Sequence, residues 1–153
     1  MLDTAFNTKV SDFGMAKLVD PRLRTQKTRV VGTYGYLAPE YVKEGRASKE
    51  SDMYGFGVVA LEIACGRRTY KDGEYNHVPL KNWVWKQYVD GNVLNAVDEG
   101  LKRDYDVNEM KCLLTVGLWC TLQDHKKRPK AEQVINVLKQ EASLPNLFTD
   151  RRA

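Results

Sequence analysis

The residues best suited to chemistry lie near the start of the sequence, in the triplet Asp12-Phe13-Gly14. The carboxylate of Asp12 offers the hard anionic oxygen that Mg²⁺ prefers, and Gly14 gives the neighbouring backbone unusual conformational freedom. Further along, Thr25 and Thr28 lie among basic side chains, where phosphorylation would add about two negative charges to a positive segment. Such a triplet is common in proteins, and Asp12 is also consistent with a solvated carboxylate at a strand end.

Three further motifs follow the triplet in a fixed order. They are "GTYGYL" leading into Ala38-Pro39-Glu40, "SDMYGFGVVALEIACGRR" at 51–68, and "HKKRP" at 125–129. In this order and spacing the four motifs resemble the C-terminal lobe of eukaryotic protein kinases. The longer segments 48–68 and 116–141 are more narrowly similar to plant receptor-like kinases, in particular the legume (L-type) lectin subgroup. The resemblance extends over nearly all of the 153 residues.

The resemblance implies a mainly α fold, a kinase C-terminal lobe with a short N-terminal β-hairpin over residues 2–12, and an incomplete kinase fold. Residues 1–143 would form a partial kinase domain. Within it, 12–40 would be the activation segment and 48–143 a helical subdomain. Residues 144–153 contain turn formers and late charges, and we expect them to form a frayed tail.

The resemblance also assigns roles in phosphoryl transfer, in which metal ions bridge the terminal phosphates of the nucleotide. Asp12 would hold a metal ion, and Phe13 would pack inward and bias its direction. Thr25 and Thr28 would lie in the activation loop, where phosphorylation could order it; an unmodified solvated linker is equally consistent with them. The hydroxyl of Thr33 would contact the catalytic base, as in Ser/Thr kinases.

Three other residues have implied architectural roles. Glu40 and Arg128 resemble the buried ion pair that ties the activation segment to the late helices. Asp52 resembles the residue that accepts backbone hydrogen bonds from the catalytic loop. Alternatively, Asp52 is a first-turn carboxylate that the helix dipole favours.

Several parts of a working kinase do not occur in these 153 residues. They are the glycine-rich loop, the strand Lys, its helix Glu partner, and the H-R-D-x-x-x-x-N loop that carries the catalytic Asp. We therefore expect Mg²⁺ and ATP to be used by a longer receptor kinase of which this chain would be a part, here called the parent protein. We do not expect this chain to bind them productively. Its own phosphotransfer should be undetectable, because positioning and electrostatic stabilisation supply most of the acceleration.

Four helices must position these residues. Ser48 predicts the N-cap of a helix that runs to about Cys65 and stops at Gly66. Its apolar side chains point in all directions, which predicts a fully buried helix; they are Met53, Phe56, Val58, Val59, Leu61 and Ile63. Pro79 suits the first position of the next helix, which Gly91 follows. Asp106 and Glu109 predict a capping box. The last helix opens at Pro129, with Val134, Ile135 and Leu138 inward.

Composition excludes several classes of function. The net charge of +4 comes from dispersed residues, so nucleic-acid binding is disfavoured. The three cysteines have no metal-type spacing, and their odd number disfavours a secreted disulfide framework. The "GFGVVA" segment at 55–60 matches a dinucleotide fingerprint, but no apolar strand precedes it. No signal peptide or membrane segment is visible, so we expect this chain to be soluble and cytosolic.

Three functional hypotheses remain. In the first, the chain is part of a plant receptor-like Ser/Thr kinase that acts on protein substrates at the cytoplasmic side of the plasma membrane. In the second, it is a non-catalytic kinase-lobe module that binds full-length receptor kinases or their substrates. In the third, it is only a target of another kinase, at Thr25 or Thr28.

Overall fold

The computed structural model describes residues 3–5, 7–9, 26–27, 30, 32–69 and 78–148. Five α-helices lie in this part of the chain: α1 Pro39–Glu44, α2 Lys49–Cys65, α3 Leu80–Val89, α4 Val107–Cys120 and α5 Ala131–Leu138. Short 3-10 helices join them: η2 Val93–Ala96, η3 Glu99–Leu101 and η4 His125–Lys127. The strands β1 Gln26–Lys27 and β2 Arg46–Ala47 pair antiparallel. The mainly α architecture expected from the sequence is confirmed.

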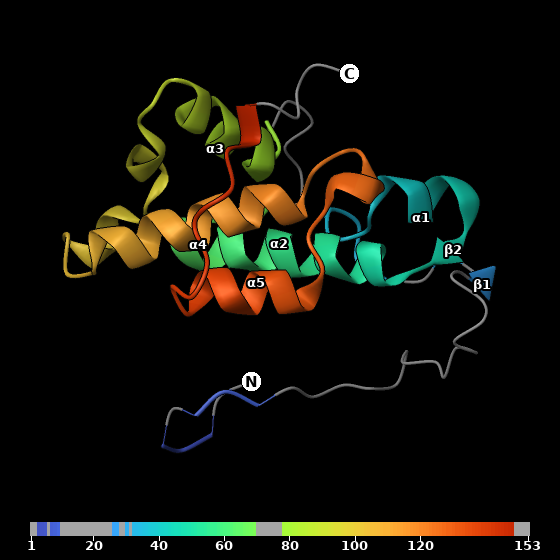
Figure 1. The fold of residues 1–153 in the computed structure, drawn as a ribbon, viewed down its shortest axis with the longest axis horizontal. Helices are drawn as coiled ribbons and strands as arrows, with labels where there is room; N and C mark the ends of the chain where they lie inside the picture. The colour runs from blue at the N-terminus through green and yellow to red at the C-terminus, as the bar shows by residue number, and fades with distance from the viewer. Residues whose placement is uncertain are drawn as a thin grey trace.

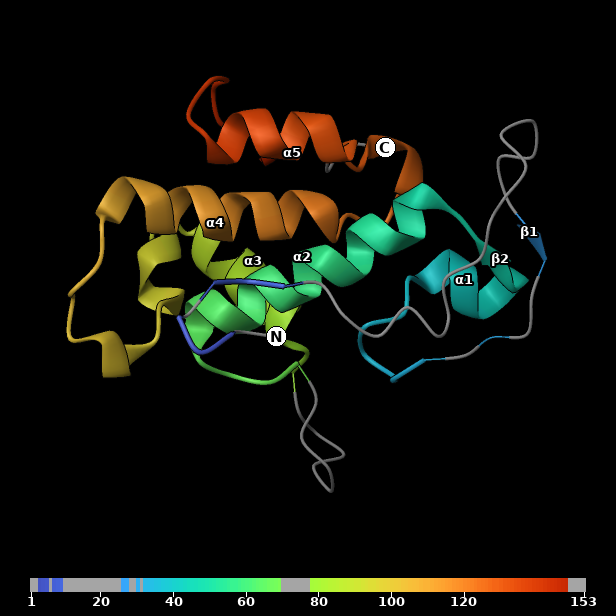
Figure 2. The same ribbon diagram turned by 90° about the horizontal axis from the view of Figure 1, so that it is seen from below.

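The helices pack in layers around α4. Figures 1 and 2 show α4 between α5 and α2, with α3 across one end of the α2–α4 pair and α1 beyond the start of α2. The main core lies between α2, α3, α4 and η2, and includes Leu61, Val84, Leu114 and Leu118. A smaller core between α4 and α5 contains Cys112, Val116 and Val137.

The ends of α2 match the sequence prediction. The Ser48 hydroxyl accepts a hydrogen bond from the Ser51 N–H at 3.1 Å, and the Ser51 hydroxyl accepts one from the Ser48 N–H at 2.9 Å. These bonds satisfy N–H groups that would otherwise lack helical partners. Gly66 ends the helix at φ 61°, a left-handed conformation that glycine adopts without steric cost.

Glycine also sets the distance between α2 and α4. A Cβ atom on Gly57 would lie 2.6 Å from the Cβ of Cys120 and 2.8 Å from the carbonyl oxygen of Gly117. A Cβ on Gly117 would lie 2.7 Å from Leu61. The two helices therefore cross at a point where only hydrogen atoms fit. Because Gly57 lies in the middle of α2, the "GFGVVA" segment is helix interior, as the sequence analysis favoured, and not a dinucleotide-binding turn.

One face of α2 is exposed, contrary to the prediction of an entirely buried helix. Phe56 and Val59 are each 43% exposed and Ile63 is 68% exposed. Their spacing places them on one side of the helix, opposite the α4 contact. The prediction was wrong because hydrophobicity all round a helix does not ensure a neighbour on every side. We call Phe56, Val59 and Ile63 the α2 apolar stripe.

Other helix boundaries differ slightly from expectation. Pro79 is the N-cap of α3 and not its first residue, and α5 begins at Ala131, two residues after Pro129. On α5, Val137 is buried with Val134, whereas Ile135 is 49% and Leu138 39% exposed, so the predicted inward positions of Ile135 and Leu138 are wrong. The side chains three residues apart, and not the adjacent pair, face α4.

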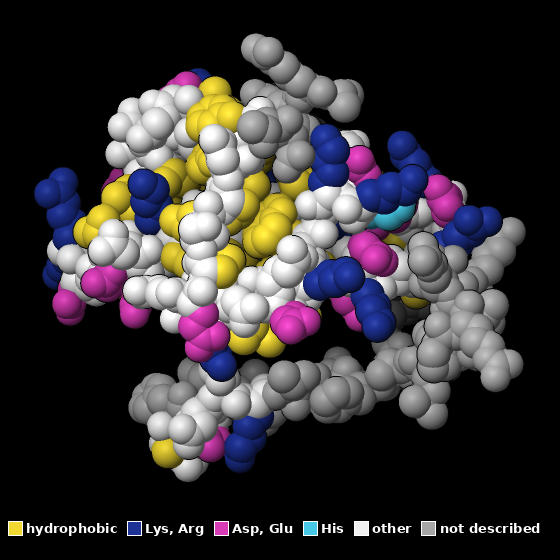
Figure 3. Space-filling view, viewed as in Figure 1, with side chains coloured by type: hydrophobic (Ala, Val, Ile, Leu, Met, Phe, Trp, Pro, Cys, Tyr) yellow, Lys and Arg dark blue, Asp and Glu magenta, His cyan; other side chains and the backbone are white. Residues whose placement is uncertain are grey.

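The C-terminal segment differs from the frayed tail expected from residue 144 onward. Leu147 is completely buried in the main core, and its N–H donates to the Tyr88 hydroxyl at 3.2 Å. Phe148 stacks on the Tyr88 ring with centroids 5.1 Å apart. Figure 3 shows hydrophobic side chains gathered over α4 between α3 and α5, the region that this segment crosses. Residues 149–153 lie outside the described residues.

The N-terminal hairpin is described only around its turn. The Asp3 N–H donates to the Asn7 carbonyl at 3.0 Å, and the Asp3 carboxylate accepts from the N–H groups of Ala5 and Asn7. Residues 10–12 lie outside the described residues, so the predicted second strand stays a prediction.

Two findings concern the whole described region. Cys65, Cys112 and Cys120 are free and buried. No helix among the described residues is long and apolar enough to cross a membrane.

Candidate functional site

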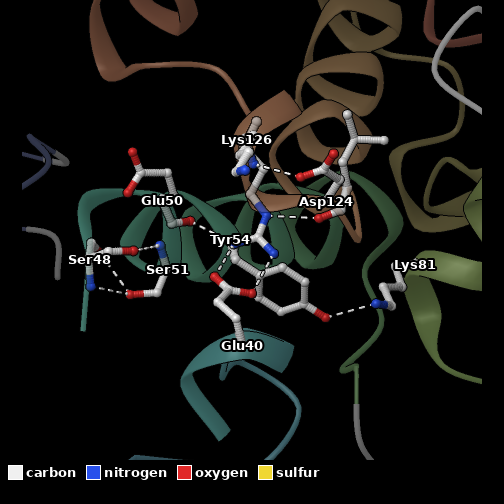
Figure 4. Close-up of polar contacts among 10 residues, drawn as sticks. Glu40, Ser48, Glu50, Ser51, Tyr54, Lys81, Asp124 and Lys126 are labelled. Atoms are coloured by element: carbon white, nitrogen blue, oxygen red, sulfur yellow. Dashed lines mark hydrogen bonds and ion pairs between the residues drawn. The ribbon is translucent and has the colours of Figure 1, made fainter. Parts of the chain in front are cut away.

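An ion pair between Glu40 and Arg128 lies at the junction of α1, α2 and the segment before α5 (Figure 4). The two residues are 88 positions apart in the sequence. Arg128 donates from Nη1 to Oε1 at 2.6 Å and from Nη2 to Oε2 at 2.9 Å, a two-pronged arrangement that suits a planar guanidinium. The Arg128 side chain is 0% exposed and that of Glu40 is 16% exposed. The predicted buried pair is thus present.

Two further N–H groups of Arg128 also find acceptors, so each of its three side-chain nitrogens makes at least one hydrogen bond. Its Nε donates to the Leu122 carbonyl at 2.8 Å, and Nη1 donates to the Glu50 carbonyl at 2.9 Å. The guanidinium therefore connects α1, the first turn of α2 and the loop after α4. A buried charge needs such partners, since each missing one costs free energy.

Local structure brings Arg128 to this position. Asp124 caps η4 by accepting from the Lys126 N–H at 3.0 Å, and the Arg128 N–H donates to the His125 carbonyl at 3.3 Å. Pro129 follows and favours an extended backbone at Arg128, which has φ −68° and ψ 147°. The turn and the proline together direct the Arg128 side chain toward α1.

Glu40 is held in its charged form by this arrangement. Burial by itself would raise the pKa of its carboxyl, but the hydrogen bonds and charge of Arg128 outweigh that effect. The charge of His125 acts in the same direction, and the net pKa of Glu40 lies below its usual value. The pair is thus ionised at neutral pH.

A second, half-buried connection was not predicted from the sequence. Glu62, on α2, accepts hydrogen bonds from the Tyr36 hydroxyl at 2.7 and 2.8 Å and from the Thr69 N–H at 2.6 Å. Burial and the neighbouring Glu62 carboxylate raise the pKa of Tyr36. Glu62 therefore fastens the segment before α1 to the C-terminal half of α2. The available sequence signal was the only carboxylate in the apolar stretch 53–65 of α2, which needs a partner when half-buried.

The other predicted site residues in the described region are separate from the ion pair. Thr33 is exposed, and its carbonyl accepts from the Tyr36 N–H at 3.2 Å in a turn. Asp52 lies in the first turn of α2, where the helix dipole favours a carboxylate. Although the residue as a whole is exposed, burial around its carboxyl raises its pKa. Within the described ranges no hydrogen-bond donor reaches that carboxyl.

The remaining predicted residues lie outside the described part of the chain. They are Asp12, Phe13, Gly14, Thr25 and Thr28. Their roles therefore stay predictions. Among the described residues no group of three or more His, Cys, Asp or Glu side chains could hold a metal ion. Metal binding by Asp12 thus stands on the sequence alone, and no reaction step is derived from it.

Comparisons with known proteins agree with this arrangement. The family model described as "Protein kinase domain" matches residues 1–138. The chain is 47% identical to the L-type lectin-domain containing receptor kinase IX.1 of Arabidopsis thaliana, over 97% of this chain and 24% of that protein. It is 44% identical to receptor kinase IX.2 of the same type and plant, over 96% of this chain and 23% of that protein. The chain thus spans about a quarter of the length of these curated relatives.

Proposed function

The chain belongs to the protein kinase family, and from this premise we propose that it is the C-terminal, substrate-side part of a receptor-like Ser/Thr kinase. The whole protein would transfer the γ-phosphate of ATP to serine or threonine side chains of protein substrates. The observation that carries the proposal is the Glu40–Arg128 pair, because it joins two family motifs 88 residues apart in a fully hydrogen-bonded contact. The kinase region would work at the cytoplasmic side of the plasma membrane.

The α2 apolar stripe supports the proposal from another direction. Three large apolar side chains that are 43–68% exposed on a central helix are an unusual surface for a finished domain. The Asp52 carboxyl lies on the same helix, with a raised pKa and no donor among the described residues. A preceding part of the kinase domain would cover the stripe and supply backbone N–H donors to Asp52.

The proposed roles of the remaining residues follow from phosphoryl-transfer chemistry. Mg²⁺ in the parent would neutralise charge on the terminal phosphates of ATP, with Asp12 as a ligand. Thr33 would face the hydroxyl of the substrate, and phosphorylation at Thr25 or Thr28 would order residues 15–37 through nearby basic side chains. Residues 12–40 would form the activation segment, and 48–143 a helical subdomain that supports it.

We also propose that the 153-residue chain does not transfer phosphate by itself. Its sequence contains no H-R-D-x-x-x-x-N loop, glycine-rich loop or strand Lys, so ATP would not be positioned and no base would accept the hydroxyl proton. Positioning and electrostatic stabilisation account for most of the acceleration in this chemistry.

The test compares three proteins in one assay of ³²P transfer from Mg-ATP to a generic Ser/Thr substrate. The first protein is this chain. The second is a chimera in which this chain follows the part of the receptor kinase IX.1 kinase region that precedes the matching segment. The third is the same chimera with Asp12→Asn. Of the three proteins, only the chimera that keeps Asp12 should be active, because it restores the catalytic loop and retains Asp12 as the proposed metal ligand. Transfer by the 153-residue chain above the Asp12→Asn background contradicts its proposed inactivity. An inactive but folded chimera contradicts the assignment as a kinase part.

A second function, a non-catalytic interaction module, is favoured by the α2 apolar stripe. In this case the stripe would bind a full-length receptor kinase. Binding of the purified chain to such a kinase, measured by calorimetry, should be lost in the Phe56→Ser, Ile63→Ser double variant and retained in Val78→Ser, whose parent residue is 58% exposed outside the stripe. Equal binding by both variants contradicts a role for the stripe.

A further inference from the structure

Tyr54 is a buried aromatic residue of α2 that contacts a lysine of α3. The residue is 5% exposed, and its hydroxyl accepts a hydrogen bond from Lys81 Nζ at 2.9 Å. The ammonium lies 5.0 Å from the ring centroid, which places it beyond the hydroxyl and not over the face of the ring. The hydrogen bond is therefore the main contact between the two residues (Figure 4).

The same ring also contacts the buried arginine. The guanidinium carbon of Arg128 lies 4.9 Å from the Tyr54 centroid, within the range of a cation–π contact. Arg128 in turn holds Glu40 with two hydrogen bonds. A chain of four side chains therefore joins α3 to α1 through Lys81, Tyr54, Arg128 and Glu40.

The Lys81 contact restricts the ring in a way that packing alone does not. A tyrosine ring held only by its faces can still tilt about its Cβ, whereas a hydrogen bond at the hydroxyl fixes the far end. Because the guanidinium of Arg128 contacts this ring and makes four hydrogen bonds to groups on separate elements, a small tilt of the ring would disturb the guanidinium. A side chain that holds a charged group in place in this way commonly changes the pKa of that group's partner without contacting the partner itself.

We propose that Lys81 is a positioning residue for the Glu40–Arg128 ion pair, acting through Tyr54. By this route α3 controls the placement of α1 and of residues 33–38, which lead into it. The significance of this coupling for substrate binding rests on the proposed function, because residues 33–38 would then face the protein substrate. The coupling itself needs neither ATP nor substrate, so it can be tested separately.

The first measurement is the pKa of the Glu40 carboxyl, followed by ¹³C NMR in the 153-residue chain. The neighbouring charged groups that lower the pKa of this carboxyl are Arg128 and His125. Tyr54→Phe should raise the pKa of Glu40 by about 0.5. This variant removes the acceptor for Lys81 without changing any charge, so the rise cannot come from lost positive charge.

Lysine variants complete the design. Lys81→Met should raise the pKa of Glu40 at least as much as Tyr54→Phe does. In the Lys81→Met, Tyr54→Phe double variant, the pKa of Glu40 should rise beyond that of Tyr54→Phe only by the effect of losing one positive charge. Lys86→Met, on an exposed residue of the same helix, measures that effect. Lys81→Arg keeps a charged donor and should leave the pKa of Glu40 near that of the parent chain.

The second measurement is hydrogen exchange of the Tyr36 amide, which is bonded to the Thr33 carbonyl. Exchange should be at least about threefold faster in Lys81→Met and Tyr54→Phe, and unchanged in Lys86→Met. Unchanged Glu40 pKa and Tyr36 exchange in folded Tyr54→Phe overturn the proposal. If Tyr54→Phe does not fold, the lysine variants decide. An equal Glu40 pKa and an equal Tyr36 exchange rate in Lys81→Met and Lys81→Arg then overturn the proposal. Failure of the kinase assay would leave both readouts unaffected.

Discussion

Replacing Glu40 by alanine should be among the most destabilising substitutions in the chain. The Arg128 side chain is 0% exposed, so the variant would leave a buried guanidinium without its counter-charge. Removing one partner from a buried pair typically costs about 3–5 kcal/mol of the free energy of unfolding. Two carbonyl acceptors remain, and Glu40 is 16% exposed, so water can reach the vacated position. We therefore expect Glu40→Ala to cost about 3 kcal/mol, near the lower end of that range.

The assay is urea unfolding of the chain, followed by circular dichroism, with a surface ion pair between the end of α1 and β2 as the control. Glu44 and Arg46 are 3.5 Å apart and both more than half exposed, so Glu44→Ala should cost no more than about 0.5 kcal/mol. Glu40→Gln retains one acceptor oxygen for Arg128 and should cost less than Glu40→Ala. A Glu40→Ala cost equal to that of Glu44→Ala refutes the reasoning.

The same pair predicts a pH dependence. Because the pKa of Glu40 is lowered in the folded chain, its ionisation stabilises the fold above the ordinary pKa of a glutamate, 4.5. That contribution is lost as the pH falls through the lower, folded-state pKa. The free energy of unfolding should therefore fall less steeply below pH 4.5 in Glu40→Gln than in the parent chain. Identical slopes contradict a depressed pKa.

Three further predictions test other parts of the fold. Gly57→Ala should cost about 1–3 kcal/mol in urea unfolding, because its Cβ would overlap Cys120. Gly55→Ala should be neutral or stabilise α2, because its Cβ would make only an ordinary contact at 3.5 Å. Equal effects of the two variants contradict the close helix crossing. Leu147→Ala should cost about 2–5 kcal/mol, and Leu144→Ala, at a 38% exposed residue, much less, with similar costs arguing against a packed C-terminal segment. Because the pKa of Tyr36 is raised above 10.0, its bond to Glu62 should stabilise the fold below that pH and stop doing so as the pH rises through the folded-state pKa; Tyr36→Phe should therefore remove part of the alkaline loss of melting temperature, and an unchanged alkaline profile contradicts it.

Local signals in the sequence were sufficient for both ends of α2 and the start of α4, but not for the first residues of α3 and α5. Ser48, Gly66 and Asp106 act as caps where the sequence predicted them, because capping depends on residues only a few positions apart; at Asp106 the cap forms without the reciprocal Glu109 bond of the predicted capping box. The Glu40–Arg128 pair was also predicted, but from family resemblance. No local pattern indicates which of the acidic residues lies against a given arginine 88 positions away.

Contacts between distant elements were the part that sequence reasoning missed. The Tyr36–Glu62 and Lys81–Tyr54 bonds join residues 26 and 27 positions apart, and each depends on how helices cross. The turn formers and late charges of residues 144–153 predicted a frayed tail, yet a single apolar side chain such as Leu147 can anchor a short segment in a core. The exposure of Phe56, Val59 and Ile63 depends on which elements lie nearby, and hydrophobicity alone does not report that.

The enclosed cysteines determine how this chain meets oxidants and alkylating reagents. Burial raises the pKa of both Cys65 and Cys120 to about 12, and burial likewise raises the pKa of Cys112. Since the thiolate is the reactive form, native protein at neutral pH should consume maleimide only where a new, accessible cysteine is introduced. Fluorophores can therefore be attached at chosen surface positions with the natural thiols left in place. The rate at which the three natural thiols react then measures how often the whole fold opens.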